Sequence, residues 1–373
     1  MASTTVLSGL ELTKWQAKFM REYVRDSGFD PYMGEALNSI ICVKNDLQSD
    51  GYTIRVPLVS RLTGNGVSGN TTLSGTEEAL GQYFFDVTWE YYRHAITLTK
   101  KEREKSANNL MEVVRPLLKE WASELVKFQL IDCFHKIDGT VFASAAAGAR
   151  NTWLTNNADR VLFGSAKANA SSNVHATALA TVDSAADKLS TAVASLAKRI
   201  ARAANPHIKP YISETYGREY YVMFCHPFCF RDLKADTVMQ QANRDARARE
   251  GDAMDKNPLF QDGDLIYDGI IFREIPEFYS ARTTGVNTST HLAGVGTTGI
   301  DVGVNFLCGQ QSLVFANKQL PMPTDKTETD YGFVIGKGIE LAHGIEKARW
   351  ANGSGTTKDN GIVTVYCSAT PDT

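Results

Sequence analysis

Four groups of residues in this sequence have side chains and spacings that could support chemistry. The first is a set of glycines, Gly294, Gly296 and Gly299, with the spacing of a dinucleotide-binding loop. Such a loop must follow a strand, open a helix and carry an acidic residue about 20 positions later. A polar segment comes before these glycines, and no acidic residue lies near position 319. We therefore predict that the Gly- and Thr-rich residues 281–300 form a surface loop.

A second group resembles a phosphate-binding loop. Gly332, Gly336 and Lys337 stand in the required order, but the two glycines are one residue too close. Gly338 also occupies the position where Ser or Thr must hold the metal ion. The sequence therefore argues against a nucleotide site here.

The other two groups could hold metal ions. Three soft ligands lie close together at Cys225, His226 and Cys229. No second Cys or His pair follows at the spacing that zinc sites use, so buried residues beside a turn are expected. Three carboxylates follow at Asp262, Asp264 and Asp268. They lack the spaced loop and closing Glu of a calcium site, which leaves turn formation as their expected role.

Missing motifs, the charge balance and the lack of long apolar runs argue against several other classes of protein. The chain has neither a Gly-x-Ser-x-Gly elbow nor a His-Glu-x-x-His helix, so we predict no enzyme and no cofactor. Its 39 basic and 42 acidic residues argue against a dedicated nucleic-acid binder, although local basic patches allow loose contact with DNA. No apolar run approaches the ~18 residues that span a membrane. The six cysteines have no framework spacing and are expected to be buried thiols.

Residues 52–98 read as a long hairpin-like excursion. Ile54, Val56 and Leu58 alternate with polar residues before a glycine-rich tip that contains Gly66 and Gly69. A returning strand then places four large apolar side chains on one face: Phe85, Val87, Trp89 and Tyr91. Because an exposed apolar face usually binds a partner, we predict that these six residues, the two glycines included, contact another molecule.

The remaining segments predict a mixed α+β protein. Residues 11–27 and 183–204 have the apolar spacing of helices, and residues 141–182 read as an irregular connector. The strongest helix pattern covers residues 101–136, with Pro116 as an expected kink. Its apolar stripe comprises Leu110, Val114, Leu117, Trp121, Leu125, Phe128 and Ile131. From Glu219 onward, short strands alternate with loops and Asp-Gly turns.

The order of these segments resembles the Hong Kong 97-type capsid fold, and several short sequence motifs resemble those of the major capsid family typified by phage N-four. The motifs include TLSGTEEAL, YVMFCHPFCFRDLK, NPLF, YDGIIFREIP and CGQQSLVFA. The positions that carry the resemblance are His226, Pro227, Asn257, Pro258, Gly269, Asp330, Tyr331 and Gly332. The resemblance spans most of the chain.

The resemblance implies a division of the chain into named parts. Residues 1–50 would be the N-terminal arm and 51–100 the E-loop. Residues 101–214 would form the P-domain with its spine helix, and 215–345 the A-domain. Residues 346–373 would return to the P-domain.

The resemblance also implies a function, which is an icosahedral phage head built from hexamers and pentamers around double-stranded DNA. No cofactor is implied, and assembly would take place in the bacterial host cytoplasm with a portal. The sequence has no lysine between Lys44 and Lys100, so we expect no covalent E-loop bond of the kind the founding member forms. The early start of the excursion leads us to expect a separate scaffolding protein. An encapsulin-type compartment shell and a cytoplasmic nucleotide-cofactor enzyme remain the alternatives.

Overall fold

The computed structural model describes residues 28–45, 51–70, 72–105, 110–170, 172–212, 217–242, 265–283, 285–326, 331, 333–351 and 357–372. Several predictions lie outside these residues, namely the helix at 11–27 and the roles of Asn257, Pro258, Asp262, Asp264, Asp330 and Gly332. The chain divides into two compact units. The larger unit comprises the described parts of Ser27–Glu90, Leu125–Lys318 and His343–Thr373, and the smaller unit those of Tyr91–Glu124 and Gln319–Ala342.

An eight-stranded mixed sheet forms the centre of the larger unit. Its main path runs β6 (Val161–Phe163), β17 (Ile362–Ser368), β12 (Val302–Cys308), β8 (Glu219–Cys225), β10 (Ile270–Glu274) and β9 (Leu265–Tyr267). The short strands β11 (His291–Leu292) and β7 (Tyr211–Ile212) pair with β12 and β8. Every residue of β12 and β17 is buried, as expected for nearly continuous apolar runs in the middle of a sheet.

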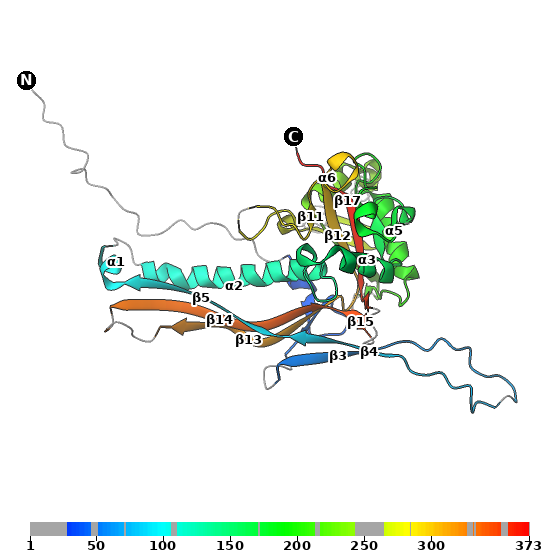
Figure 1. The fold of residues 1–373 in the computed structure, drawn as a ribbon, viewed down its shortest axis with the longest axis horizontal. Coiled ribbons are helices and arrows are strands. Elements are labelled where there is room, and N and C mark those ends of the chain that lie inside the picture. Colours follow the sequence, from blue (N-terminus) through cyan, green and yellow to red (C-terminus); the bar gives the residue numbers. More distant parts are fainter. Residues whose placement is uncertain are drawn as a thin grey trace, which may run out of the picture. The chain divides into compact units, whose positions relative to one another are not determined.

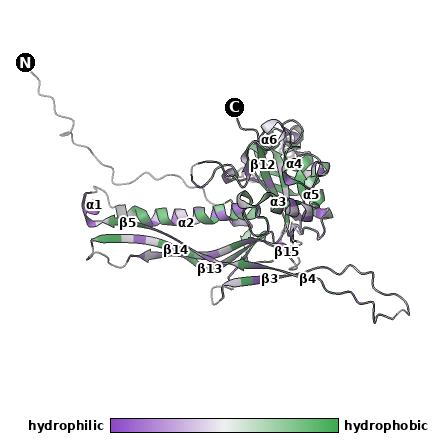
Figure 2. Ribbon diagram, viewed as in Figure 1, coloured by the Kyte–Doolittle hydropathy of each residue, from purple (hydrophilic) through white to green (hydrophobic). Residues whose placement is uncertain are grey.

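Helices lie around this sheet (Figure 1). Two separate hydrophobic clusters are buried on its two faces. The helices are α3 (Ala147–Asn156), α4 (His175–Leu179), α5 (Thr191–Ala203) and α6 (Pro227–Ala235). Along β8, Val222 and Phe224 belong to one cluster, whereas Met223 and Cys225 belong to the other. Side chains alternate across a strand, so this run of apolar residues supplies both faces. Figure 2 shows the corresponding concentration of hydrophobic residues on the strands and helices.

A second sheet has the strand order β1 (Met33–Gly34), β2 (Ile41–Lys44), β13 (Leu313–Asp325), β14 (Val334–Lys347) and β5 (Glu90–Thr99). The long strands β13 and β14 each contribute residues to both units, as does the long helix α2 (Leu110–Phe134). Within the smaller unit, His94 of β5 stacks on Trp121 of α2 with ring centroids 4.9 Å apart. The Lys100 amide, at the start of α1 (Lys100–Lys105), donates to the Phe333 carbonyl at 2.8 Å.

The smaller elements complete the fold. Two-stranded sheets pair β3 (Thr53–Val59) with β4 (Gln82–Thr88) and β15 (Arg349–Ala351) with β16 (Thr357–Asp359). Five 3-10 helices are described, at Asp30–Tyr32, Phe142–Ser144, Lys167–Ala170, Pro276–Phe278 and Thr297–Gly299. Within the described residues, no helix is long and apolar enough to cross a bilayer.

The long helix predicted over residues 101–136 is confirmed as α2 from Leu110 to Phe134, while Lys100–Lys105 form the separate helix α1, and the predicted buried face is only partly correct. Pro116 lies inside α2, and Val114 and Ile131 are buried as expected. Leu117 is exposed, whereas its neighbour Leu118 and then Ala122 are buried. Because neighbouring helix positions point about 100° apart, apolar residues at both 117 and 118 leave the buried face ambiguous in the sequence.

Three predictions about local structure are wrong. Residues 141–182 are not an irregular connector, since they contain α3, α4 and the fully buried strand β6. The second helix begins at Thr191 rather than at 183, because the Ser190 side chain caps it by accepting from the Val193 amide. Residues 281–300 are not a simple surface loop, because Thr290 and His291 are buried.

The eight-stranded sheet takes its strands from three of the expected segments, 101–214, 215–345 and 346–373. Strand β17, from the last of these, lies between β6 and β12. The segment 101–214 likewise contributes β6 and α5 to this sheet and its cover. The reason is that β17 is apolar on both faces and needs the middle of a sheet to bury them.

Other predictions are confirmed. Asp268 and Gly269 both have positive φ, 50° and 69°, and form the two-residue turn between β9 and β10. All six cysteines are buried free thiols.

Candidate assembly surface on the long hairpin

The long hairpin consists of β3, β4 and the tip that joins them, residues 60–81. The two strands pair in antiparallel register from Thr53 opposite Thr88 to Val59 opposite Gln82. Figure 1 shows the tip continuing beyond the ends of β3 and β4 as a loop without regular secondary structure. Every described residue from Arg61 to Leu80 is exposed. The tip is therefore available to contact another molecule.

The base of the long hairpin is buried by the chain itself, which corrects one part of the prediction. Phe85 and Val87 are only 2% and 1% exposed. They pack in a cluster of six buried residues whose other members are Cys42, Val314, Ala316 and Ala348. The cross-strand partners of Phe85 and Val87, which are Val56 and Ile54, are partly buried against the same cluster. The alternation was correct, but these two side chains already have an intramolecular partner.

Trp89 and Tyr91 have different surroundings. Trp89 is half-buried, and its indole Nε1 donates to the Gly51 carbonyl at 2.8 Å. Its ring lies edge-on to Tyr52, with centroids 5.7 Å apart. Tyr91 is 52% exposed on β5. Trp89 therefore anchors the start of the long hairpin, whereas Tyr91 retains a large exposed area.

The exposed apolar side chains of the long hairpin are not the predicted ones. They are Val59, Leu62, Val67, Leu73, Leu80 and Phe84. Phe84 faces away from the buried side because it neighbours Phe85 on the strand. The isolated leucines of the tip have no periodicity, so the alternation of apolar residues does not predict them. Composition alone could have indicated them, because large apolar residues are unusual in a glycine-rich polar loop and suggest a binding role.

Charged groups stabilise the exposed part of the long hairpin. Arg55 and Asp86 stand directly opposite each other and form a bidentate pair, with N–O distances of 2.8 and 2.9 Å. Glu78 accepts hydrogen bonds from the backbone amides of Thr63 and Gly64, both at 2.7 Å. These bonds to the charged form hold the pKa of Glu78 below its usual value. The two sides of the tip are thus tied together beyond the last strand pair.

We expect the Glu78→Gln substitution to loosen this tie, because a neutral amide accepts more weakly than a carboxylate. Hydrogen exchange at the Thr63 and Gly64 amides should accelerate by up to roughly tenfold. Glu77→Gln is the matched control, since Glu77 accepts from the Gly75 amide instead. Unchanged exchange at Thr63 and Gly64 in Glu78→Gln would show that the bonds contribute nothing in solution.

The glycines of the tip have the backbone conformations that the sequence suggested. Gly66 and Gly69 both have φ of +68°, and no atom lies within 4 Å of where a Cβ would be. Their requirement for glycine is therefore conformational rather than steric.

Of Cys225, His226 and Cys229, which are all buried, only His226 takes part in a chain of polar contacts with His291 and Asp301. Pro227 is the first residue of α6, and His226 caps that helix by accepting from the Phe228 amide at Nδ1. Nε2 of His226 lies 3.2 Å from Nδ1 of His291, whose Nε2 lies 3.3 Å from Asp301. Burial lowers the pKa of His226 to about 3, so its imidazole is neutral. No cluster of metal-binding side chains occurs among the described residues.

The remaining candidate residues that the structure describes lie in turns and in segments between strands. The segment with Gly294, Gly296 and Gly299 is followed by strand β12, not by the helix that a dinucleotide site requires. Gly269 belongs to the β9–β10 turn. Tyr331 is fully exposed between β13 and β14. These positions share no common site in the described structure.

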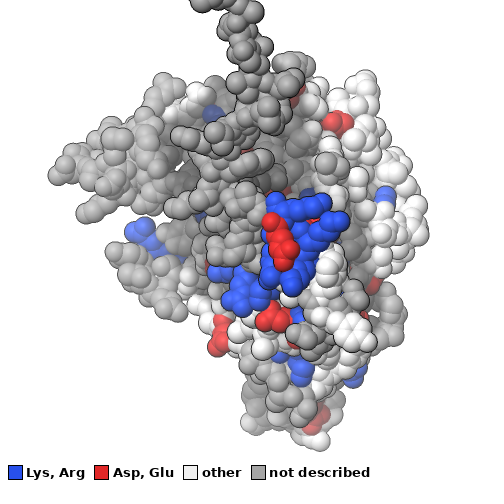
Figure 3. Space-filling view, turned by 90° about the vertical axis from the view of Figure 1, so that its left-hand side faces the viewer, with Lys and Arg blue, Asp and Glu red and all other residues white. Residues whose placement is uncertain are grey.

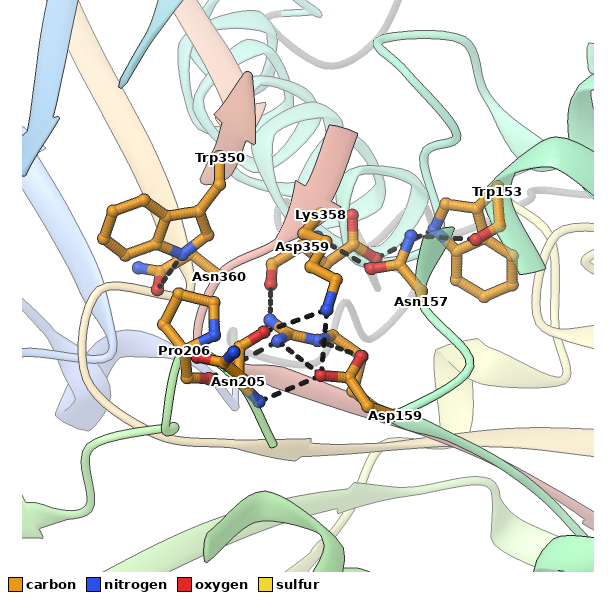
Figure 4. A network of polar contacts seen from close by, with 10 residues as sticks. Trp153, Asn157, Asp159, Asn205, Pro206, Trp350, Lys358, Asp359 and Asn360 are labelled. Carbon is orange, nitrogen blue, oxygen red and sulfur yellow. Dashed lines mark hydrogen bonds and ion pairs between the residues drawn. The ribbon is translucent and has the colours of Figure 1, made fainter. Parts of the chain in front are cut away.

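A buried network of charges holds the end of the β15–β16 ribbon against α3 (Figure 4). Asp359 accepts from Lys347 Nζ at 2.6 Å and from Trp153 Nε1 at 3.0 Å. The side chains of Lys347 and Asp359 are only 3% and 7% exposed. Arg160 donates to the Asp359 carbonyl, and Asn157 accepts from the Asp359 amide at 2.8 Å. Residues about 200 positions apart in the chain therefore share one polar site.

A cluster of basic side chains occurs in the smaller unit. Figure 3 views the side that carries α1 in Figure 1, and Lys and Arg side chains gather there around fewer carboxylates. Helix α1 exposes four basic residues, Lys100, Lys101, Arg103 and Lys105.

Comparisons with known proteins point to one family. A family model described as phage capsid protein matches residues 3–370. The major capsid protein of Pseudomonas phage KPP25 is 24% identical over 383 residues, which cover 97% of this chain and 96% of that protein. A chain of the Cyanophage Pam1 capsid asymmetric unit is 31% identical with a TM-score of 0.86, and all of both chains is covered. The capsid of Ralstonia phage GP4 is 21% identical with a TM-score of 0.72 over all of both chains, a likeness of fold.

Proposed function

The chain belongs to the phage capsid protein family, and from this premise we propose that the long hairpin joins neighbouring copies of it in a phage head. The protein is a major capsid protein with the Hong Kong 97-type fold, a structural component of the virion capsid and not an enzyme. Its function is to associate with itself into the shell. The encapsulin and cofactor-enzyme alternatives find no support in these relatives.

One observation carries the proposal about the long hairpin. Its tip exposes large apolar side chains that the described chain does not cover, including Leu62, Leu73 and Leu80, which are 53–64% exposed. Burying such side chains is favourable by roughly 1.5–3 kcal/mol each. A shell provides many identical copies whose surfaces can do so, and each copy repeats the same contact. Of the predicted contact residues, Gly66 and Gly69 in the tip and Tyr91 on β5 remain candidates for contact with a neighbouring copy, whereas the buried Phe85 and Val87 do not.

We propose the domain names on sheet membership rather than on sequence position. The eight-stranded sheet with α3 to α6 corresponds to the A-domain. The five-stranded sheet and α2 correspond to the P-domain and its spine helix, and the long hairpin to the E-loop. The segment before Gly28 would be the N-terminal arm.

We also propose the finer features of assembly. The subunits form hexamers and pentamers with the help of a separate scaffolding protein and a portal, in the bacterial host cytoplasm. The packaged double-stranded DNA is contacted without sequence preference. The exposed basic residues of α1 support such contact, because phosphate neutralisation needs positive charge and no particular base.

The test of the proposed contact is a triple substitution, Leu62→Ser with Leu73→Ser and Leu80→Ser. All three side chains are exposed, so the subunit should keep its circular dichroism spectrum, and its free energy of unfolding should change by no more than ~0.5 kcal/mol per substitution. The yield of closed shells, measured by sedimentation and negative-stain microscopy, should fall by at least tenfold. The reason is that the contact is repeated at every copy in the shell.

Leu37→Ser is the matched control. Leu37 is 65% exposed, like Leu62 at 64%, but it lies outside the long hairpin. It should assemble normally. If the triple variant closes shells as efficiently as this control, the long hairpin does not provide the contact between copies.

A further inference from the structure

The sequence contains the dipeptide Asn-Gly, in which asparagine loses its side-chain amide most readily. When Gly follows Asn, its backbone nitrogen can reach the side-chain carbonyl carbon of that Asn without hindrance from a Cβ. Three Asn-Gly pairs occur, and two of them, Asn65–Gly66 and Asn360–Gly361, lie in the described structure. The reaction needs a backbone that can bend toward the side chain, so the surroundings of each pair decide its rate.

Asn65–Gly66 lies in the tip of the long hairpin, where little restrains it. Both residues are exposed and outside regular secondary structure. A Cβ on Gly66 would find nothing within 4 Å, so there is space around the attacking nitrogen. Within the part of the chain that the structure describes, no hydrogen bond is made by the Asn65 side chain. Its amide group is therefore free to turn toward the Gly66 nitrogen.

Asn360–Gly361 has the same chemistry in a fixed environment. The Asn360 Oδ1 accepts from Trp350 Nε1 at 3.1 Å, a contact visible in Figure 4, and its Nδ2 donates to the Gln311 carbonyl at 3.1 Å. The Gly361 carbonyl accepts from the Gly309 amide at 2.8 Å. A Cβ on Gly361 would lie 2.6 Å from the Gln310 carbonyl oxygen, which shows how closely the backbone is enclosed. Reaction here requires local opening.

We propose that Asn65 is a site of spontaneous deamidation on the tip of the long hairpin. The Gly66 nitrogen bonds to Cγ of Asn65, the bond from Cγ to the amide nitrogen breaks, and ammonia leaves with the proton that Gly66 loses. Water then opens the resulting five-membered imide at either carbonyl, which yields aspartate or isoaspartate. Both products carry a new negative charge next to Gly64, whose amide donates to the Glu78 carboxylate. The isoaspartate also adds one atom to the backbone of the tip.

Assembly should protect this site, an inference that rests on the proposed function. If the tip is held against a neighbouring copy in the shell, its backbone bends less freely and the attack slows. The chemistry at Asn65 does not depend on assembly, so the two parts can be tested separately.

The first experiment follows the unassembled full-length subunit in mildly alkaline buffer. Peptide mass spectrometry should detect the mass gain of amide hydrolysis and an isoaspartate at position 65. Modification at Asn65 should be at least roughly a hundredfold faster than at Asn360, which must wait for local opening. Asn65→Gln should abolish the signal at that position without altering the peptide that contains Asn360. Equal rates at the two sites, or an unmodified Asn65, would overturn the assignment.

The second experiment compares the same protein in closed shells and as free subunits. Slower modification of Asn65 in shells is expected. Equal rates would contradict the protection of the tip by a neighbour, while fast modification of the free subunit would still support the deamidation site itself.

Discussion

Replacing Asp359 with alanine is expected to lower the free energy of unfolding by about 3 to 5 kcal/mol. Lys347 would keep a buried positive charge with its 2.6 Å partner removed, and the Trp153 indole would lose its acceptor. An unpaired buried charge costs far more than a surface charge, because no water replaces the missing carboxylate. Denaturant unfolding of the full chain, followed by tryptophan fluorescence, measures the loss directly.

The control for Asp359→Ala removes both charges together. The double variant Lys347→Met with Asp359→Leu leaves no uncompensated ion and should be markedly more stable than the single substitution. Asp359→Asn should fall between them, since its oxygen can still accept from Trp153 Nε1. A double variant as unstable as Asp359→Ala would mean that packing, and not charge, dominates at this site.

Acid is expected to destabilise the larger unit strongly, starting near pH 6.5. Burial lowers the pKa of His175 and His343 to about 4 and that of His226 to about 3, from an ordinary value of 6.5. As the pH falls below 6.5, these histidines bind protons in the unfolded chain but remain neutral in the folded chain. This stability is complete above pH 6.5 and is lost progressively down to about pH 4 for His175 and His343 and to about pH 3 for His226. One pKa unit corresponds to ~1.4 kcal/mol, so the loss is on the order of 3 kcal/mol for each of His175 and His343 and on the order of 5 kcal/mol for His226.

The pH dependence can be assigned by removing one buried histidine. His343→Gln should flatten the slope of unfolding free energy against pH between 6.5 and 4 by up to one proton, because the buried imidazole is gone. His207→Gln is the control, since His207 is exposed. Denaturant titrations at several pH values test both variants. Identical slopes in the wild type and in His343→Gln would exclude this histidine as a cause.

The long hairpin shows which features a local sequence pattern determines and which it does not. Alternation in the sequence correctly predicted that Phe85, Val87 and Trp89 share one face. It did not reveal what that face contacts, because Cys42 and Val314 come from distant parts of the chain. An apolar face without a partner in its own segment looks the same whether a sister copy or the same chain covers it. The exposed leucines of the tip were therefore found only in the structure.

Local signals alone determined the elements whose causes are local. The β9–β10 hairpin follows from Asp268 and Gly269, which adopt positive φ, and the central strand β8 follows from its apolar run. The long helix follows from its spacing of apolar residues. These features depend on residues a few positions apart, so the sequence by itself specifies them.

The tertiary structure decided everything that depends on distant segments meeting. It placed the C-terminal strand β17 between β6 and β12, and it brought Asp359 to Trp153 across 206 positions. It also gave the residues 141–182 their helices and buried strand. Such pairings depend on the total free energy gained by burying whole faces and by pairing buried charges. A local sequence pattern does not determine that total, because it involves residues from distant segments.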